Sequence, residues 1–182
     1  MKLHDISRPL APGVWTWPGD TPFDCTLAWR RSQGASVNVG RVTMSLHCGT
    51  HIDAPFHFAD DGPTSEHIPL AHCVGPCEVL PLERLAEATE ERVLVRAGGG
   101  APSLAQLASL AQPLKLLGTD GHSMDRMDST TLEAHHHLWR RGAVILEELD
   151  LEGVPDGRYQ LIVLPLRLDG MDAAPARAVL IG

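Results

Sequence analysis

The chain lacks several features that define whole classes of protein. Its 182 residues contain no apolar run near the roughly 20 residues that cross a bilayer, and the first residues lack the apolar core of a signal peptide. Basic residues are few: 15 Lys and Arg stand against 23 Asp and Glu, which gives a formal net charge of −8. A surface of that sign repels nucleic acid and anionic lipid. We therefore expect a cytoplasmic protein with no nucleic-acid partner and no membrane partner.

Cysteine pairs with metal-binding spacing are also missing, because none of the four cysteines forms a C-x₂-C pair. A domain of this length does not need disulfides, so we expect all four thiols to be reduced. The contents of hydrophobic residues (43%) and charged residues (21%) are ordinary for a folded protein, and they predict one domain over residues 1–182. Ten histidines, beside three Phe and one Tyr, are the unusual part of the composition.

Apolar patterns along the chain predict a mixture of strands and helices. Alternation predicts a strand at Val37–Leu46 with a bulge near Gly40, and Thr130 and Glu133 have the spacing of a capping box before a helix that Gly142 should end. The other predicted strands are 74–80, 92–96, 113–118, 143–146 and 161–164, and the other predicted helices are 82–88 and 104–110. This order favours the α/β class, with a mixed sheet and flanking helices.

The strongest chemical signal is the segment 47–57, which holds three histidines and a carboxylate within eleven residues. In extended chain the side chains of His51 and Asp53 share a face, and a Gly-Thr turn before them can bring His47 alongside. Imidazole nitrogens with a carboxylate oxygen suit Zn²⁺, with Mn²⁺, Fe²⁺ or Co²⁺ possible, whereas Ca²⁺ and Mg²⁺ demand more oxygens. The whole spaced set favours a metal site over polar residues that only bond to one another.

A second group of candidate ligands lies nearer the C-terminus. On a helix, His135 and His136 share the apolar face and His137 projects away, so the spacing leaves the first two equally open. Glu147 ends an apolar strand, and because burying an unpaired carboxylate is costly, we expect a partner such as a metal ion. The alternative for Glu147 is an exposed strand end.

Five motifs in register give the chain a family resemblance. It resembles the metal-dependent cyclase family, and within it the bacterial kynurenine formamidases. The motifs are Trp17–Phe23, His47–His57, Asp128–His136, Ile145–Glu147 and Asp172–Arg177.

The resemblance implies a swivelling β/β/α fold, a homodimer and two Zn²⁺ ions in each chain. By this similarity His47 and His51 bind one ion, His135 binds the other, and two carboxylates bridge them, which are Asp53 and Glu147. His57 matches the family's proton donor and acceptor, and Trp17 matches its substrate-contacting tryptophan. The implied activity is a zinc-dependent arylformamidase in tryptophan degradation, which hydrolyses N-formyl-L-kynurenine to L-kynurenine and formate.

Two departures from the family pattern keep other substrates open. The stretch 97–118 is shorter than in relatives, and His122 stands where a proline is usual. An alternative is therefore a cyclase-family enzyme that acts on another amide, a lactam or a secondary metabolite. A metal-loaded binding or structural protein is a third hypothesis. His57 argues against it, because closed structural zinc sites have no use for a further base.

Overall fold

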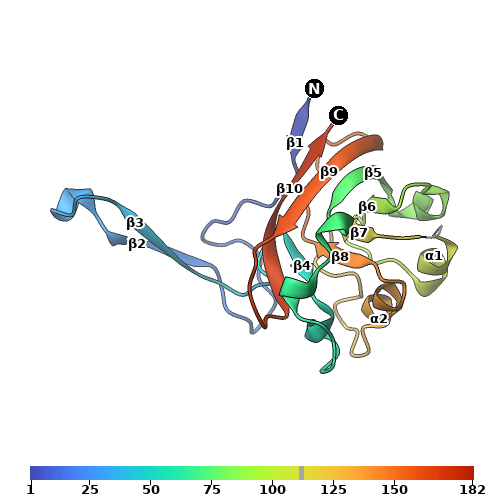
Figure 1. Cartoon of the computed structure of the whole chain (residues 1–182), viewed down its shortest axis with the longest axis horizontal. Coiled ribbons are helices and arrows are strands. Elements are labelled where there is room, and N and C mark those ends of the chain that lie inside the picture. Colours follow the sequence, from blue (N-terminus) through green and yellow to red (C-terminus); the bar gives the residue numbers. More distant parts are fainter. Residues whose placement is uncertain (111–112) are drawn as a thin grey trace.

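The computed structural model describes residues 1–110 and 113–182, and within them eight strands form one mixed sheet. The order is β1-β10-β4-β8-β7-β6-β5-β9, and β9 also pairs with β10, which closes the sheet into a barrel (Figure 1). The strands are β1 (Leu3–Asp5), β4 (His51–Asp53), β5 (Val74–Pro81), β6 (Arg92–Arg96), β7 (Leu116–Thr119), β8 (Val144–Glu147), β9 (Gly157–Pro165) and β10 (Ala173–Ile181). The predicted α/β class with a mixed sheet is confirmed.

Strands β5 to β8 run parallel, and β6, β7 and β8 are buried on both faces, which explains why these three read as short apolar runs. Leu94 on β6 faces a core inside the barrel, whereas its neighbours Val93 and Val95 face a second core on the outside. Helices α1 (Leu104–Ser109) and α2 (Glu133–Arg140) cover that outer core. Alternate residues of one strand therefore supply two separate cores.

The predicted helices differ in how well they match the structure. The one expected at 104–110 is confirmed as α1, where Ser103 and Gln106 form a capping box. The one expected at 82–88 is a 3₁₀ helix, Leu82–Glu87. The shortened stretch expected at 97–118 includes residues 111 and 112, which lie outside the described residues.

The capping box predicted for α2 is wrong. Its N-cap is Leu132, which has a left-handed backbone (φ 46°), and its side chain makes no capping bond. The carboxylate of Asp125 performs the capping instead, because it accepts the backbone N–H groups of Ala134 (3.0 Å) and His135 (3.1 Å). Gly142 follows the helix with φ +72°, so the predicted end is confirmed.

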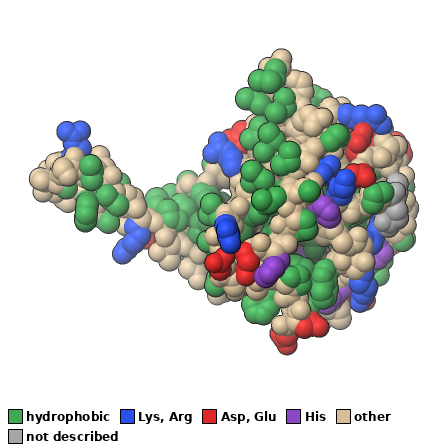
Figure 2. All heavy atoms as spheres, viewed as in Figure 1, with side chains coloured by type: hydrophobic (Ala, Val, Ile, Leu, Met, Phe, Trp, Pro, Cys, Tyr) green, Lys and Arg blue, Asp and Glu red, His purple; other side chains and the backbone are tan. Residues whose placement is uncertain are grey.

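A two-stranded ribbon projects away from the barrel (Figure 1), formed by β2 (Asp24–Trp29) and β3 (Val39–Thr43). The predicted strand at 37–46 is confirmed in part as β3. The pairing of the two strands is irregular close to Gly40, as predicted. The extra residue, however, is on β2, between Leu27 and Trp29. All residues of both strands are exposed. Figure 2 shows hydrophobic side chains along this ribbon, where solvent surrounds them.

Candidate metal centre and its cavity

Two neighbouring strands and one helix build the centre of the site. On β4, Ile52 faces the barrel interior, so His51 and Asp53 project from the outer face. The antiparallel register with β8 places Glu147 directly opposite His51. Helix α2 supplies His135, which is 1% exposed. The four side chains are all buried, although each is polar.

His47 reaches this group through a tight turn. Gly49 has φ +68°, and a Cβ atom there would lie 2.6 Å from the Leu10 side chain, so the turn favours glycine. The turn brings His47 Nδ1 to 3.1 Å from His51 Nε2 and to 3.1 Å from Asp53 Oδ1. The predicted juxtaposition of these three side chains is present in the structure.

Each histidine of the centre has one ring nitrogen engaged by an oxygen outside the centre. His51 Nδ1 lies 2.8 Å from the carbonyl oxygen of Gly49, His135 Nδ1 lies 2.6 Å from Asp125 Oδ2, and His47 Nε2 lies 3.0 Å from Asp172 Oδ2. When these nitrogens carry the ring proton, the other nitrogen of each ring presents a lone pair toward Asp53. Metal-binding histidines in proteins are oriented in this way.

The two oxygens of Asp53 face two different sets of donors. Oδ1 lies 3.2 Å from His51 Nε2 and close to His47, whereas Oδ2 lies 3.2 Å from His135 Nε2. The second set also contains Glu147, whose Oε1 lies 3.3 Å from His135 Nε2. Buried Asp53 Oδ1 accepts no hydrogen bond from the described residues. In each set, imidazole nitrogens and carboxylate oxygens converge on one point, which suits a metal ion. Because the two sets share Asp53, these residues suit a dinuclear centre.

The ionisable groups perturb one another strongly. Burial opposes the charged form of His47, but the neighbouring carboxylates of Asp172 and Asp53 outweigh it and raise the pKa of His47 to about 10. Burial likewise opposes charge on His135, and its carboxylate partners, Asp125 foremost, raise the pKa to about 12. Burial would raise the pKa of Asp53, yet the imidazoles around it lower that pKa well below its usual range. The carboxylates of the centre therefore favour positive charge beside them, whether a proton or a metal ion carries it.

His57 lies at the edge of this centre. It follows Pro55 in a 3₁₀ turn, its ring centroid is 4.1 Å from that of His47, and its Nδ1 is 3.6 Å from Asp172 Oδ2. The side chain is 33% exposed, in contrast to the buried His51 and His135. His47, His57 and Asp172 are also close enough together to hold an ion. The position therefore suits either a proton-transfer group beside the centre or a further ligand.

A cavity of about 470 Å³ opens over the centre. Its wall combines the candidate ligands His47, His51, His135 and Glu147 with His57 and a set of aromatic and loop residues, which are Trp15, Trp17, Pro18, Gly19, Asp20, His122, Ser123 and Leu132. Trp17 meets Trp15 edge to face, with the ring centroids 5.8 Å apart. The volume is typical of a site for a small molecule.

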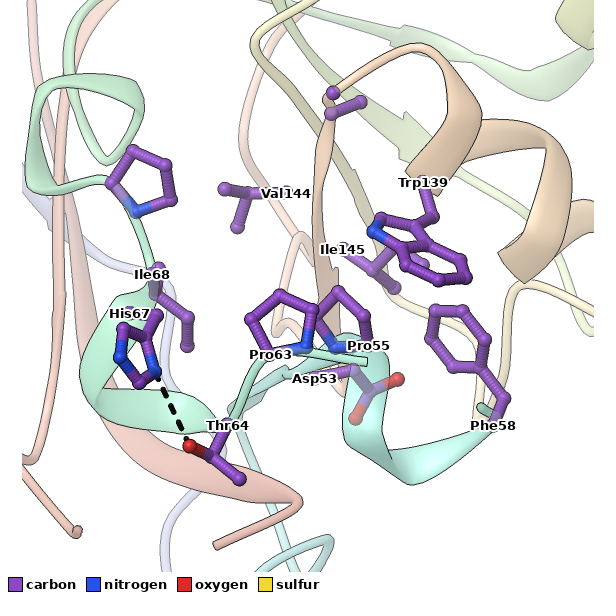
Figure 3. A pocket seen from close by; sticks show the side chains of 13 residues that line it. Asp53, Pro55, Phe58, Pro63, Thr64, His67, Ile68, Trp139, Val144 and Ile145 are labelled. Atoms are coloured by element: carbon purple, nitrogen blue, oxygen red, sulfur yellow. Dashed lines mark hydrogen bonds between the residues drawn. The ribbon is translucent and has the colours of Figure 1, made fainter. Parts of the chain in front are cut away.

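A smaller cavity of about 220 Å³ lies beside the centre and is mostly apolar. Figure 3 shows Asp53 at one side of it and Phe58 next to Trp139, whose ring centroids are 5.9 Å apart. His67, which also lines it, bonds to Thr64 Oγ1 at 3.2 Å. Phe58 also packs edge to face on His135, with 5.3 Å between the ring centroids. The Phe58 ring therefore packs against one of the candidate ligands from the side of this cavity.

The sequence did not single out the two carboxylates that orient the histidines. Asp172 lies in the motif 172–177, where its spacing indicates no role, and Asp125 lies outside all five motifs. Asp172 directly precedes β10, and the pairing of Ala173 with Asp53 fixes it beside the site. His136, which the spacing left open, lies outside the donor sets and contacts Phe58, with 5.2 Å between the ring centroids.

Comparisons with known proteins agree with this architecture. The cyclase family model, described as "Putative cyclase", matches residues 4–98. A kynurenine formamidase of Bacillus cereus (strain ATCC 14579) is 40% identical over 199 residues, which cover 97% of this chain and 95% of the relative. A solved potential metal-dependent hydrolase with cyclase activity has a TM-score of 0.82 and 28% identity, over 98% of this chain and 96% of that one.

A second solved structure, a predicted metal-dependent hydrolase from Bacillus stearothermophilus, has a TM-score of 0.76 and 28% identity. It covers 98% of this chain and 97% of its own. The similarity thus spans the ribbon, the barrel and the candidate centre alike. The chain belongs to the cyclase family of metal-dependent hydrolases.

Proposed function

We propose that this protein is a zinc-dependent arylformamidase that hydrolyses N-formyl-L-kynurenine to L-kynurenine and formate in tryptophan degradation. The observation that carries the metal-dependent activity is the position of Asp53, whose two oxygens face two separate sets of donor atoms. The similarity to a kynurenine formamidase over nearly the full length of both chains supports the choice of substrate.

The metal ions would be held by imidazole and carboxylate groups. His47 and His51 would bind one Zn²⁺, His135 would bind the other, and Asp53 and Glu147 would bridge the pair. Bound zinc supplies a Lewis acid and lowers the pKa of water, so that a nucleophile is available at neutral pH. Met124 helps to hold Glu147 in place, because its backbone N–H donates to Glu147 Oε1 at 2.6 Å.

His57 would move the protons that hydrolysis requires. Addition of water across the formyl C–N bond takes one proton from water and gives one to the anilino nitrogen, which leaves with the aryl group. His57 borders the cavity, and Asp172 lies 3.6 Å from its Nδ1, which leaves Nε2 for the substrate side. A histidine has a pKa suited to both steps near neutral pH.

Trp17 would bind the aryl ring. It lines the cavity with its indole 37% exposed, and its edge-to-face contact with Trp15 limits the orientations it can adopt. Stacking on an aromatic ring would hold the substrate so that its formyl group lies over the metal ligands. The ligand of this cavity is therefore a small aromatic molecule.

We further propose that the protein is a cytoplasmic homodimer. The ribbon β2–β3 exposes Leu27, Trp29, Val39 and Val42, and the connection between its strands exposes Val37, each at least 38% accessible. A two-stranded ribbon with no further cover is marginally stable in water, so a second copy of the chain would bury these side chains. Four free thiols suit a reducing compartment. No helix among the described residues has the length and apolar character needed to cross a bilayer.

The activity is tested with purified protein and N-formyl-L-kynurenine. We expect release of formate and L-kynurenine, loss of that activity after chelation, and recovery when zinc is restored. Elemental analysis should give about two metal equivalents for each chain. Turnover of a lactam or another amide, with no turnover of N-formyl-L-kynurenine, would assign the chain a different substrate within its family. A single tightly bound equivalent would contradict the dinuclear centre.

A further inference from the structure

His122 lies in a wall that two cavities share. One is the 470 Å³ cavity over the metal centre, and the other is an open cavity of about 830 Å³ on the outer side, which Arg8 and Asp120 also line. The imidazole ring is 37% exposed, and the indole of Trp15 stacks on it with the centroids 3.7 Å apart and the planes 12° apart. His122 therefore presents a polar edge at the point where the substrate cavity opens outward.

The opposite edge of this ring is fixed in the interior. His122 Nδ1 donates to Oε1 of Glu148, which is 1% exposed, and Glu148 Oε2 lies 2.7 Å from Arg8 Nε. Arg8 Nη2 in turn donates to the carbonyl oxygen of Asp120 at 2.7 Å. Because Nδ1 faces a buried carboxylate while the ring as a whole is partly open, Nε2 is the nitrogen left for a ligand in the cavity.

The backbone at Glu148 is strained so that this arrangement can form. Glu148 has φ +59°, a conformation that L-residues other than Asn and Asp rarely adopt. Two hydrogen bonds hold it there: its N–H donates to the carbonyl oxygen of Gly121 at 3.1 Å, and its own carbonyl oxygen accepts from Thr50 Oγ1 at 2.6 Å. This backbone conformation directs the Glu148 carboxylate toward His122. The preceding residue, Glu147, is a candidate metal ligand.

We propose that His122 is a specificity-determining residue that binds the α-amino-acid end of the substrate. This inference rests on the proposed function, in which the formyl group lies at the metal ligands and the aryl ring lies on Trp17. The amino-acid end must then lie against another part of the cavity wall, and His122 and Ser123 belong to that wall. His122 Nε2 offers it a polar contact, while Trp15 and Glu148 act as positioning residues that hold the ring.

The test compares two substrates that differ only at that end. N-formyl-L-kynurenine carries the amino-acid group, and 2-formamidoacetophenone has the same ring and formamide without it. We expect His122→Ala to lower kcat/KM for the first about 10- to 100-fold, mainly through KM, because a hydrogen bond to a charged group is lost. The change for the second should stay below about twofold. His4→Ala, at a histidine on β1 that lines neither cavity, should change neither.

A second variant separates substrate binding from support of Glu148. The amide of His122→Asn can replace Nδ1 as the donor to Glu148, but it has no atom in the position of Nε2. We expect it to show the same selective loss as His122→Ala. Full activity of His122→Asn, equal losses on both substrates, or no loss in either variant would each overturn the proposal. If the wild-type protein hydrolyses neither substrate, the proposed function fails, whereas turnover of N-formyl-L-kynurenine upholds it whatever the variants do.

Discussion

At the scale of single residues, Asp53 shows how a buried charge becomes useful. A carboxylate that is 4% exposed would be costly on its own, yet imidazoles approach both of its oxygens. The outer nitrogens of those rings are held in turn by Asp172, Asp125 and a backbone carbonyl. The candidate ligands are therefore surrounded by a second set of polar groups that orient them. Metal centres in proteins typically have both sets.

The role of His57 gives the first prediction. We expect His57→Ala to lower kcat about 10²- to 10⁴-fold while the metal content stays unchanged, because the side chain transfers protons without holding an ion. Steady-state kinetics and elemental analysis on the same sample measure both quantities. His4→Ala is a matched control, since His4 lies on β1 and packs against Tyr159. Parallel loss of metal would instead make His57 a ligand together with His47 and Asp172.

The sequence could predict that three of the candidate ligands lie side by side because these residues are close together in the chain. His47, His51 and Asp53 fall within seven residues, so a turn and a short strand suffice to bring them together. Asp172 is 125 residues from His47, and only the sheet makes them neighbours. No local pattern indicates such a contact, and for the same reason spacing alone could not choose between His135 and His136.

At the scale of elements, the start of α2 links helix stability to the metal centre. Asp125 caps the helix and also bonds to His135 Nδ1 at 2.6 Å. We expect Asp125→Ala to cost about 1 kcal/mol of stability through the lost cap and to weaken metal affinity about 10- to 100-fold. Denaturant unfolding of the metal-free protein and competition with a chelator measure the two effects.

The control for that prediction is Thr130→Ala, at the residue that the sequence pattern favoured as a cap. Thr130 is exposed, and the N-cap position belongs to Leu132, so we expect a change within about 0.5 kcal/mol and no change in metal affinity. A large effect at Thr130, or none at Asp125, would contradict the capping geometry.

The ribbon gives a prediction about assembly. We expect the double variant Trp29→Ser with Val42→Ser to fold with an unchanged melting curve but to sediment as a monomer, because both side chains are more than half exposed in the single chain. Leu70→Ser is the control, since Leu70 is 59% exposed but lies in a 3₁₀ turn just before β5, outside the ribbon. A wild-type chain that sediments as a monomer would show that the ribbon has another use.

The sequence predicted the central strands best, and these are the strands that tertiary packing covers on both sides. Strands β6, β7 and β8 are short apolar runs, and each was found near its expected place. Strand β10 was missed because Ala173–Ala178 consists largely of small residues with a proline at 175, a composition without strand preference. Its pairing with β1, β4 and β9 depends on the closed barrel, which no single segment indicates.

At the scale of the whole molecule, protons and metal ions compete for the same site. Burial disfavours charge on His47 and His135, yet their carboxylate partners raise the pKa values to about 10 and about 12. Raised values mean that the metal-free fold gains stability from these protons below about pH 6.5 and loses it as the pH rises through about 10. We therefore expect the melting temperature of chelated protein to fall between pH 6.5 and pH 10.

The metal-loaded protein should behave differently, because the cations replace those protons. Its melting temperature should stay nearly constant over the same range, and loading at pH 7.5 should release protons. Titration calorimetry in buffers of different ionisation enthalpy measures the number released. A flat melting profile for the chelated protein would contradict the strong coupling between these imidazoles and carboxylates.

The closure of the barrel by β10 also sets when the enzyme can form. Strand β10 is the last of the strands in chain order, yet it pairs with β1 near the start of the chain and with β4 beside the metal centre. During synthesis the ribosome makes β4 long before β10 exists, so segment 47–57 must wait without its sheet partner and without Asp172. The centre is thus assembled only after nearly all of this sequence has been translated, and until then its imidazoles and carboxylates are open to stray cations.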